Sequence, residues 1–240
     1  MKTKIIALLG LAVVLFGFSQ VNSMDKKMED PMKMTPENTR TAVFAGGCFW
    51  CTESDFEKVD GVVEVISGYT GGHVDNPTYK QVSAGIGGHI ESVQVTYDPE
   101  VIDYRGILDY FWRHIDPTRD DGQFCDSGSQ YRPAIFYQDD TQKKLAIAST
   151  KQIEQTKPFA QPLKVELIQA STFYLAEDYH QDYYKKNPLR YNFYRYNCGR
   201  DARVEQLFGL APVELGRGAR QLGARVHAQQ LFGVRMRERH

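Results

Sequence analysis

The sequence predicts an α+β fold, a two-layer sandwich of helices packed on a mixed or antiparallel sheet. Segments with the periodicity of strands and of helices interleave along the chain. The strands alternate apolar with polar residues, whereas the strands of a buried parallel sheet are almost wholly apolar. With 240 residues, of which 42% are hydrophobic, the chain has enough material for one sizeable core. One main domain is therefore expected.

The predicted elements begin with a short apolar strand, Thr41–Ala45. Gly46-Gly47 ends this strand, and a helical segment runs from Cys48 to about Val59. A second apolar strand spans Val62–Tyr69 and ends in a turn-rich stretch. Further along, the pattern predicts an alternating strand at Glu91–Tyr97, a helix with apolar residues from Ile107 to Ile115, a strand at Ala134–Tyr137, a helix at Asp140–Thr156 and an alternating strand at Lys164–Ala170.

The C-terminal part of the predicted domain is rich in tyrosine. Half of the fourteen tyrosines lie between Tyr174 and Tyr196. Tyrosine buries a large apolar ring while keeping its hydroxyl hydrogen-bonded. We therefore expect an amphipathic helix in a long C-terminal segment that wraps against the core.

The first residues have the pattern of an export signal. Basic residues at positions 1–4 precede an apolar run from Ile5 to Phe18, and small or apolar residues lead to Ser23. The run is shorter than the roughly 20 residues that span a bilayer, so no membrane span is expected after cleavage. The predicted location is exported, in the periplasm. Translation from Met24 would instead give a cytoplasmic form.

The domain boundaries follow from composition. A cleaved signal is expected over residues 1–23, a polar, Met-rich and disordered linker over 24–40, the main domain over 41–209 and a basic, disordered tail over 210–240. The formal net charge of -1 gives no reason to expect a nucleic acid or an anionic membrane as a partner. We expect a monomer.

Cys48 is the first candidate for chemistry. It stands at a predicted helix start behind two glycines that allow another molecule to approach the backbone. The free N–H groups and the dipole of a helix N-terminus stabilise a thiolate, so the pKa of Cys48 is expected to fall. Phe49 and Trp50 follow and suggest a pocket for a small apolar group.

Cys48 and Cys51 form a CxxC pair with three interpretations. A zinc site normally needs a second close pair, whereas Cys125 and Cys198 are isolated in the sequence. A thioredoxin-like oxidoreductase carries CxxC at a helix start. The third interpretation is a nucleophile that becomes a sulfenic acid and is resolved by a second thiol. The residues alone leave the last two open.

Glu91 is a candidate acid because it shares the apolar face of its predicted strand with Val93 and Val95. Burial disfavours the charged form of a carboxyl group and raises its pKa towards the range of a useful general acid. Reduction of a sulfoxide needs such an acid, because the departing oxygen must be protonated. Alternatively, Glu91 lies in solvent or pairs with a nearby base.

Five motifs in register resemble those of the A-type peptide methionine sulfoxide reductases. The resemblance covers about residues 41–209 and implies a ferredoxin-like α/β sandwich. It also implies thiol-dependent reduction of the S epimer of methionine sulfoxide, free or in oxidised proteins. The motifs are Gly46-Gly47-Cys48-Phe49-Trp50-Cys51-Thr52-Glu53, Ser67-Gly68-Tyr69-Thr70-Gly71-Gly72, Asn76-Pro77-Thr78-Tyr79, Gly88-His89-Ile90-Glu91 and Asp126-Ser127-Gly128-Ser129-Gln130-Tyr131-Arg132.

The resemblance assigns a role to each matching position. The tyrosine hydroxyls donate hydrogen bonds without carrying charge, which suits them to a sulfoxide oxygen. The implied roles are nucleophile for Cys48, methyl-binding aromatics for Phe49 and Trp50, acid for Glu91, oxygen-binding hydroxyls for Tyr79 and Tyr131, and substrate-region carboxylate for Asp126.

The resolving thiol is left open between two positions. Tyr196-Asn197-Cys198-Gly199-Arg200 resembles a C-terminal recycling segment, and its glycine favours mobility, so Cys198 is preferred over Cys51. Cys125 is expected to be a nonparticipating thiol. The resemblance implies a thioredoxin-like reductant, and no metal or organic cofactor is needed because thiols carry the electron pair. The alternative function is a CxxC thiol-disulfide oxidoreductase.

Overall fold

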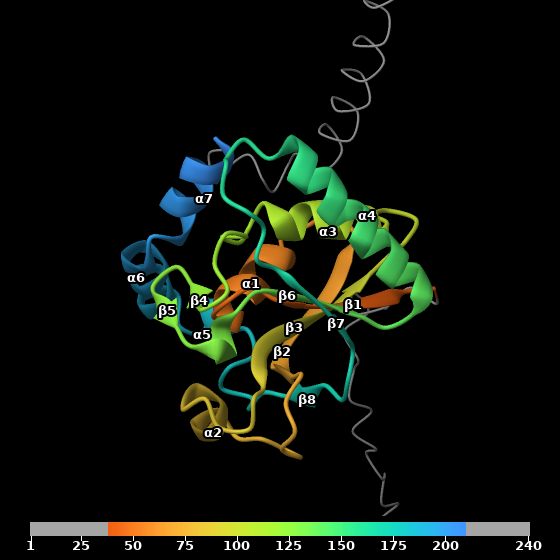
Figure 1. Ribbon diagram of the computed structural model, residues 1–240. Coiled ribbons are helices and arrows are strands. Elements are labelled where there is room, and N and C mark those ends of the chain that lie inside the picture. The colour runs from red at the N-terminus through yellow and green to blue at the C-terminus, as the bar shows by residue number, and fades with distance from the viewer. Residues whose placement is uncertain (1–37, 210–240) are drawn as a thin grey trace, which may run out of the picture. The chain divides into compact units, whose positions relative to one another are not determined.

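A computed structural model describes residues 38–209 of the chain (Figure 1). The predicted signal at 1–23, the predicted linker as far as residue 37 and the predicted tail from residue 210 lie outside the described residues. Among the helices of residues 38–209, none is long and apolar enough to cross a bilayer.

A six-stranded sheet forms the centre of the fold, in the order β7-β6-β1-β3-β2-β8. Neighbouring strands are antiparallel except for the parallel pair β6 and β7. The predicted α+β class with a mixed sheet is therefore confirmed. The strands are β1 (Arg40–Ala45), β2 (Val62–Thr70), β3 (Ile90–Tyr97), β6 (Ala134–Tyr137), β7 (Glu166–Gln169) and β8 (Tyr174–Leu175), and a small second sheet joins β4 (Gly122–Gln123) to β5 (Asp126–Ser127).

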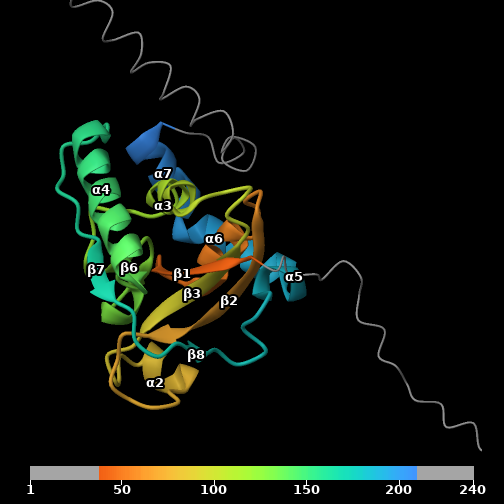
Figure 2. The ribbon, with the colours of Figure 1, turned by 90° about the vertical axis from the view of Figure 1, so that its right-hand side faces the viewer.

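Three helices bury one face of this sheet. These are α1 (Phe49–Phe56), α3 (Tyr104–Trp112) and α4 (Asp140–Thr156). On β1, Phe44 points into this side and stacks on Phe56 at 5.3 Å and on Phe111 at 4.9 Å between ring centroids. Figure 2 shows α3 and α4 at one end of the sheet and α2 (Tyr79–Ser83) with β8 at the other.

The opposite face of the sheet is covered by non-helical segments of the chain rather than by helices. Val43 and Ala45 of β1 pack there with Phe136, against a segment that includes Ile168 and Phe173. The approach is close, because a Cβ atom at Gly68 would lie 2.4 Å from the Phe173 ring. Only glycine therefore fits at this point of β2.

Burial of both faces corrects the expected pattern of β3. The alternating sequence predicted one buried face, yet Ser92 and Thr96 on the other face are buried as well. β3 lies between β1 and β2, and covering chain excludes water from its second side. Short hydroxyl side chains tolerate this position, and the Ser92 hydroxyl donates to the Ile90 carbonyl at 3.1 Å.

The Tyr-rich region, where an amphipathic helix was expected, folds into a short strand and two helices. After β8 come α5 (Tyr183–Lys186) and α6 (Pro188–Cys198), and Gly199 in the left-handed conformation turns the chain into α7 (Arg200–Phe208). The sequence did not predict α2, the β4 and β5 hairpin, the 3-10 turn η1 (Ser129–Tyr131) or α7. The ferredoxin-like and wrapping descriptions stay predictions.

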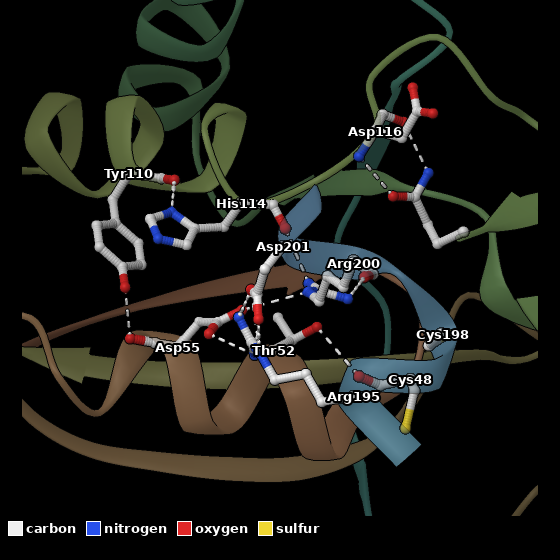
Figure 3. Close-up of polar contacts among 12 residues, drawn as sticks. Cys48, Thr52, Asp55, Tyr110, His114, Asp116, Arg195, Cys198, Arg200 and Asp201 are labelled. Carbon is white, nitrogen blue, oxygen red and sulfur yellow. Dashed lines mark hydrogen bonds and ion pairs between the residues drawn. The ribbon is translucent and has the colours of Figure 1, made fainter. Parts of the chain in front are cut away.

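A buried ion pair attaches α6 and α7 to α1 (Figure 3). Asp55 of α1 has a side chain that is only 4% exposed, and it lies 2.7 Å from an Arg195 nitrogen and 3.3 Å from Nε of Arg200. Burial favours the neutral acid, but the two guanidinium groups outweigh it and lower the pKa of Asp55. Arg195 also pairs with Asp201, whose side chain is 39% exposed.

We predict that Asp55→Asn strongly destabilises the protein. The substitution leaves the buried guanidinium of Arg200 without its charge partner and removes one of the two carboxylates that pair with Arg195, which costs about 3–5 kcal/mol of unfolding free energy. Asp201→Asn is the matched control, and it should cost less than about 1 kcal/mol because water screens the exposed pair. Denaturant unfolding monitored by circular dichroism measures both, and equal losses would contradict the assignment of the anchor to Asp55.

Candidate active site

The N-terminus of α1 holds the candidate nucleophile. Cys48 is the N-cap, and its carbonyl accepts the backbone N–H of Cys51 at 3.1 Å. Gly47 has φ of 87° and lies so close to the Gln123 side chain that an added Cβ would stand 2.6 Å from it. The two glycines thus fit the sharp turn between β1 and α1 beneath β4.

Cys48 and Cys51 are free thiols and are only 7% and 2% exposed. Burial, the hydrogen bond to Cys51 and the nearby acids raise the pKa of Cys48 well above its usual value. The sequence-based expectation of a lowered pKa is therefore wrong, because burial outweighs the helix terminus. The hydrogen bond from Cys48, assisted by Arg200 and Arg195, lowers the pKa of Cys51 against the opposing effect of burial.

Glu91 lies beside the start of α1 and is 2% exposed. Its Oε2 accepts the backbone N–H of Phe49 at 3.1 Å, one residue after the nucleophile. Burial raises the pKa of Glu91 to about 8, and the hydrogen bond from Phe49 only partly offsets that effect. The expected buried carboxyl group with a raised pKa is confirmed, and the alternative of a solvated Glu91 is wrong.

Tyr79 and Tyr131 face the same acids from other elements. Tyr79 begins α2, where Thr78 and Gln81 form a capping box. Burial, together with the charges of Glu91 and Cys48, raises the pKa of Tyr79 to about 12. Burial and Glu91 likewise raise the pKa of Tyr131, at the end of η1. Both phenols therefore stay protonated and can donate a hydrogen bond.

The two aromatic residues after Cys48 occupy different environments. Phe49 is fully buried, and its ring lies 6.4 Å from that of Tyr79 and 5.0 Å from that of His180. Trp50 is half-buried and stacks on Tyr183 with ring centroids 3.6 Å apart. Its Nε1–H donates to Nδ1 of His180 at 2.9 Å, so the neutral imidazole carries its own proton on Nε2.

Asp126 joins the site from β5 and contacts a disulfide. The structure links Cys125 to Cys198, which corrects the expectation that Cys125 is a nonparticipating thiol. The carboxylate oxygens of Asp126 lie 3.8 Å from the Cys125 sulfur and 4.0 Å from the Cys198 sulfur, and one accepts the hydroxyl of Tyr194. Burial raises the pKa of Asp126, against the effect of Tyr194.

The predicted site residues therefore converge in space. The charge of Asp126 contributes to the pKa shifts of Cys48, Glu91, Tyr79 and Tyr131, so these groups share one electrostatic environment. Cys198 stands at its border, paired with Cys125 in the state observed.

A separate acidic cluster lies at the other end of α1. The carboxylates of Glu53, Glu57 and Asp182 have ligand atoms within 4.8 Å of one another. Lys185 already pairs with Glu57 at 2.6 Å and with Asp182 at 2.8 Å. Burial raises the pKa of Glu53 to about 7, which reduces its charge near neutral pH. The negative charge of the cluster is thus balanced by Lys185 and reduced by protonation of Glu53, so the cluster needs no metal ion to explain it.

Sequence reasoning missed three residues that shape the site. His180 orients Trp50, Tyr194 binds Asp126, and Arg200 donates to the Gly46 carbonyl at 3.0 Å. The density of tyrosines between 174 and 196 indicated that this segment packs on the core. No local pattern indicated which of its side chains would reach residues 68 to 154 positions earlier.

Residues 40–210 match the sequence profile described as "Peptide methionine sulfoxide reductase". The chain is 55% identical over 199 residues to the "Peptide methionine sulfoxide reductase MsrA/MsrB" of Vibrio cholerae, covering 83% of this chain and 52% of the relative. This chain thus spans about half the length of that protein. It is 52% identical over 172 residues to the "Peptide methionine sulfoxide reductase MsrA 2" of Caulobacter vibrioides, covering 71% of this chain and 86% of the relative.

The fold is also similar to a solved structure. The reduced form of Mxr1 from Saccharomyces cerevisiae superposes with a TM-score of 0.60 at 33% identity. The match covers 64% of this chain and 88% of the yeast chain.

We predict that Glu91→Gln increases the stability of the protein most strongly at high pH. A carboxyl group whose pKa is raised by folding binds its proton more tightly in the native state. Its contribution therefore weakens as pH rises from about 4.5, the ordinary pKa, to about 8, the native pKa. The difference between variant and wild type should grow across this window, by at most about 1.4 kcal/mol per pH unit.

Denaturant unfolding at pH 5, 7 and 9 measures this difference. Glu100→Gln, at an exposed carboxylate in the turn after β3, is the control and should follow the wild-type profile. An unchanged gap between Glu91→Gln and wild type at all three pH values would refute the buried-acid assignment.

Proposed function

The chain belongs to the peptide methionine sulfoxide reductase family, and from that premise we propose that it reduces the S epimer of methionine sulfoxide, free or within oxidised proteins. One observation carries the proposal. A buried thiol, Cys48, lies beside a buried acid, Glu91, whose pKa of about 8 keeps it largely protonated at neutral pH. This pair supplies the two groups that removal of a sulfoxide oxygen needs.

The first step transfers oxygen from sulfur to sulfur. The Cys48 proton passes along its hydrogen bond to Cys51, and the Cys48 thiolate attacks the sulfoxide sulfur, so that a sulfur–sulfur bond forms. Glu91 protonates the oxygen during this attack. The hydroxyl group then moves from the substrate sulfur to the Cys48 sulfur, and the sulfur–sulfur bond breaks with its electron pair on methionine. Methionine leaves and Cys48 becomes a sulfenic acid, so the substrate gains the electron pair that Cys48 loses.

The surrounding residues position the substrate in this scheme. The hydroxyls of Tyr79 and Tyr131 donate to the sulfoxide oxygen, where negative charge develops. Trp50, held by His180 and Tyr183, and Phe49 contact the methyl group of the substrate. Asp126 binds the substrate region through the hydrogen bonds around its carboxylate.

The second step closes a disulfide. We favour Cys51 as the resolving thiol because it already hydrogen-bonds Cys48, whereas Cys198 is paired with Cys125 in the observed state. The Cys51 sulfur attacks the sulfenic sulfur, and the proton that Cys51 took from Cys48 passes to the departing hydroxyl, so a Cys48–Cys51 disulfide forms and water leaves. A thioredoxin-like dithiol protein restores the thiols. This order of thiols revises the preference for Cys198 that the sequence suggested.

The rival function, a CxxC thiol-disulfide oxidoreductase, fits the structure less well. Such an enzyme must expose its thiolate to a disulfide in another protein. Cys48 and Cys51 are both buried. A methionine sulfoxide side chain is narrow and flexible, so it reaches a buried thiol more easily than a disulfide of another protein does.

The remaining parts of the proposal concern the whole chain. We propose that residues 1–23 direct export to the periplasm, that the chain acts as a monomer and that its ferredoxin-like domain is wrapped by its C-terminal segment. The sequence pattern supports the export, and translation from Met24 would give a cytoplasmic form.

Substitution of the nucleophile and of the acid should affect methionine formation to different extents. Prereduced protein, given S-methionine sulfoxide without a reductant, should form methionine in a stoichiometric burst. Cys48→Ser should abolish the burst because serine is not a nucleophile at this site. Glu91→Gln should slow it about 10²–10⁴-fold, the range for loss of a general acid. Amino-acid analysis in rapid-quench samples measures the burst.

Two further arms test the finer claims. Cys51→Ser should still transfer one oxygen and then accumulate a sulfenic acid that a dione probe labels. The R epimer should give no burst. Methionine formation by Cys48→Ser would overturn the function, and insulin reduction without sulfoxide turnover would favour the rival oxidoreductase.

Export predicts a shortened mature chain. Protein recovered from the periplasm of a host cell should begin at about residue 24 and lack residues 1–23, because a signal peptidase removes the apolar segment. Intact-mass measurement of the periplasmic and cytoplasmic fractions checks this. A chain that keeps residues 1–23 and stays in the cytoplasm would contradict the export proposal.

A further inference from the structure

Glu177 joins two tyrosines through one carboxylate. It follows β8, which Figure 2 shows beside α2. One carboxylate oxygen, Oε1, accepts the backbone N–H of Tyr79 at 2.9 Å, and the other, Oε2, accepts the hydroxyl of Tyr69 at 2.8 Å. Burial favours the neutral acid, but these hydrogen bonds and that of its own backbone N–H outweigh burial and lower the pKa of Glu177. The group is therefore an anion, and no step of the proposed reaction employs it.

The position of α2 depends on contacts at its two ends. The helix is five residues long, and only Val82 among them is buried. At its start, Glu177 accepts the N–H of Tyr79, and at its end the Gln130 side chain donates to the Ser83 carbonyl at 3.0 Å. So short a helix is not stable by itself. The contact with Glu177 therefore fixes the end of α2 that carries Tyr79.

Tyr69 extends the same contact to the aromatic wall of the site. Its side chain is fully buried, and its ring lies 5.8 Å from that of Phe49 between centroids. Burial and the hydrogen bond to Glu177 raise the pKa of Tyr69, so the phenol keeps the proton that it donates. Phe49 in turn lies 6.4 Å from the Tyr79 ring. One carboxylate thus links the residue proposed to bind the sulfoxide oxygen to a neighbour of the residue proposed to bind the methyl group.

The turn that carries Glu177 is attached to the sheet without help from its carboxylate. The Gln181 side chain accepts the Ser67 N–H of β2 and donates to the Ser67 carbonyl, both at 2.9 Å. The N–H of Ala176 also donates to the Ser67 carbonyl, at 3.0 Å. Loss of the Glu177 carboxylate should therefore leave this segment in place and release the Tyr79 end of α2.

We propose that Glu177 is a positioning residue for sulfoxide reduction, whose carboxylate fixes the backbone of Tyr79 so that the Tyr79 hydroxyl meets the sulfoxide oxygen. The inference rests on the proposed function, which gives Tyr79 that role. Tyr69 supplies the second hydrogen bond and keeps the carboxylate in one orientation. A donor stabilises developing charge most effectively when it is already in place, because no free energy is then spent on moving it.

Removal of the Glu177 side chain tests the inference. In prereduced, full-length Glu177→Ala, the burst of methionine formed from S-methionine sulfoxide should be about 10–100-fold slower, because a displacement of about 1 Å can cost about 10²-fold. The rate at saturating substrate should change more than the half-saturating concentration, since the Tyr79 hydroxyl acts on charge that develops in the transition state. The burst amplitude should stay that of wild type, because Cys48 and Cys51 are unchanged. Rapid-quench sampling measures both.

Asp103→Ala is the matched control. The Asp103 carboxylate also accepts a backbone N–H at the start of a helix, that of Gly106 in α3, at 2.9 Å. This variant loses a comparable hydrogen bond away from Tyr79 and should keep the wild-type burst rate. Circular dichroism checks that both variants are folded at the assay temperature. An equal loss in both alanine variants, or no loss in Glu177→Ala, would overturn the inference.

A double-mutant cycle tests whether Glu177 acts through Tyr79. Tyr79→Phe removes the hydroxyl, so no donor remains for Glu177 to position. Addition of Glu177→Ala to Tyr79→Phe should therefore slow the burst by less than about twofold, far less than in the wild-type background. The same loss in both backgrounds would mean a structural effect that is unrelated to the hydroxyl, and it would refute the assignment.

Two conservative variants separate geometry from charge. Glu177→Gln keeps the length of the side chain, with an amide oxygen to accept from Tyr79 and an NH₂ group to donate to Tyr69, so its burst rate should stay within about threefold of wild type. Glu177→Asp keeps the charge but is too short to reach both tyrosines, so its burst should slow about tenfold. The reverse order would assign the effect to charge and overturn the inference. Absence of a burst from the wild type would instead mean failure of the proposed function.

Discussion

The arrangement of the site depends on one buried carboxylate, Asp55. The Asp55 side chain on α1 is only 4% exposed, and its partners Arg195 and Arg200 replace the water it has lost. The ion pair fixes α6 and α7 against α1, and Arg200 continues to the carbonyls of Gly46 and His114. The helix that carries the nucleophile and the helices that carry Cys198 are therefore held as one unit.

Burial then determines the chemistry of the groups within that unit. Exclusion of water favours the neutral forms of Glu91 and Cys48 and so raises both pKa values, while the guanidinium groups near Cys51 favour its anion. An acid that keeps its proton thus lies next to a thiol pair that shares one. The same exclusion of water shields the sulfur atoms of Cys48 and Cys51, which are only 7% and 2% exposed.

The sequence indicated most of the regular structure, because apolar periodicity records which side of a strand or helix is buried. β6 and α4 have the predicted bounds, Ala134–Tyr137 and Asp140–Thr156. The pattern was less informative for β3, since small hydroxyl residues such as Ser92 can be polar in sequence and buried in the fold. The short elements α2, β4 and β5 were missed because their conformation follows from turn residues and capping rather than from periodicity.

The sequence by itself determined the family, the fold class and the residues that gather around Cys48, because each motif carries a side chain whose chemistry is recognisable alone. Only the tertiary structure decided that the Cys48 pKa rises rather than falls, and that Cys198 pairs with Cys125. Both outcomes depend on distances, and on the exclusion of water, between segments that lie far apart in the chain. The two bridged cysteines, for example, are 73 residues apart in the sequence. No local pattern encodes those quantities.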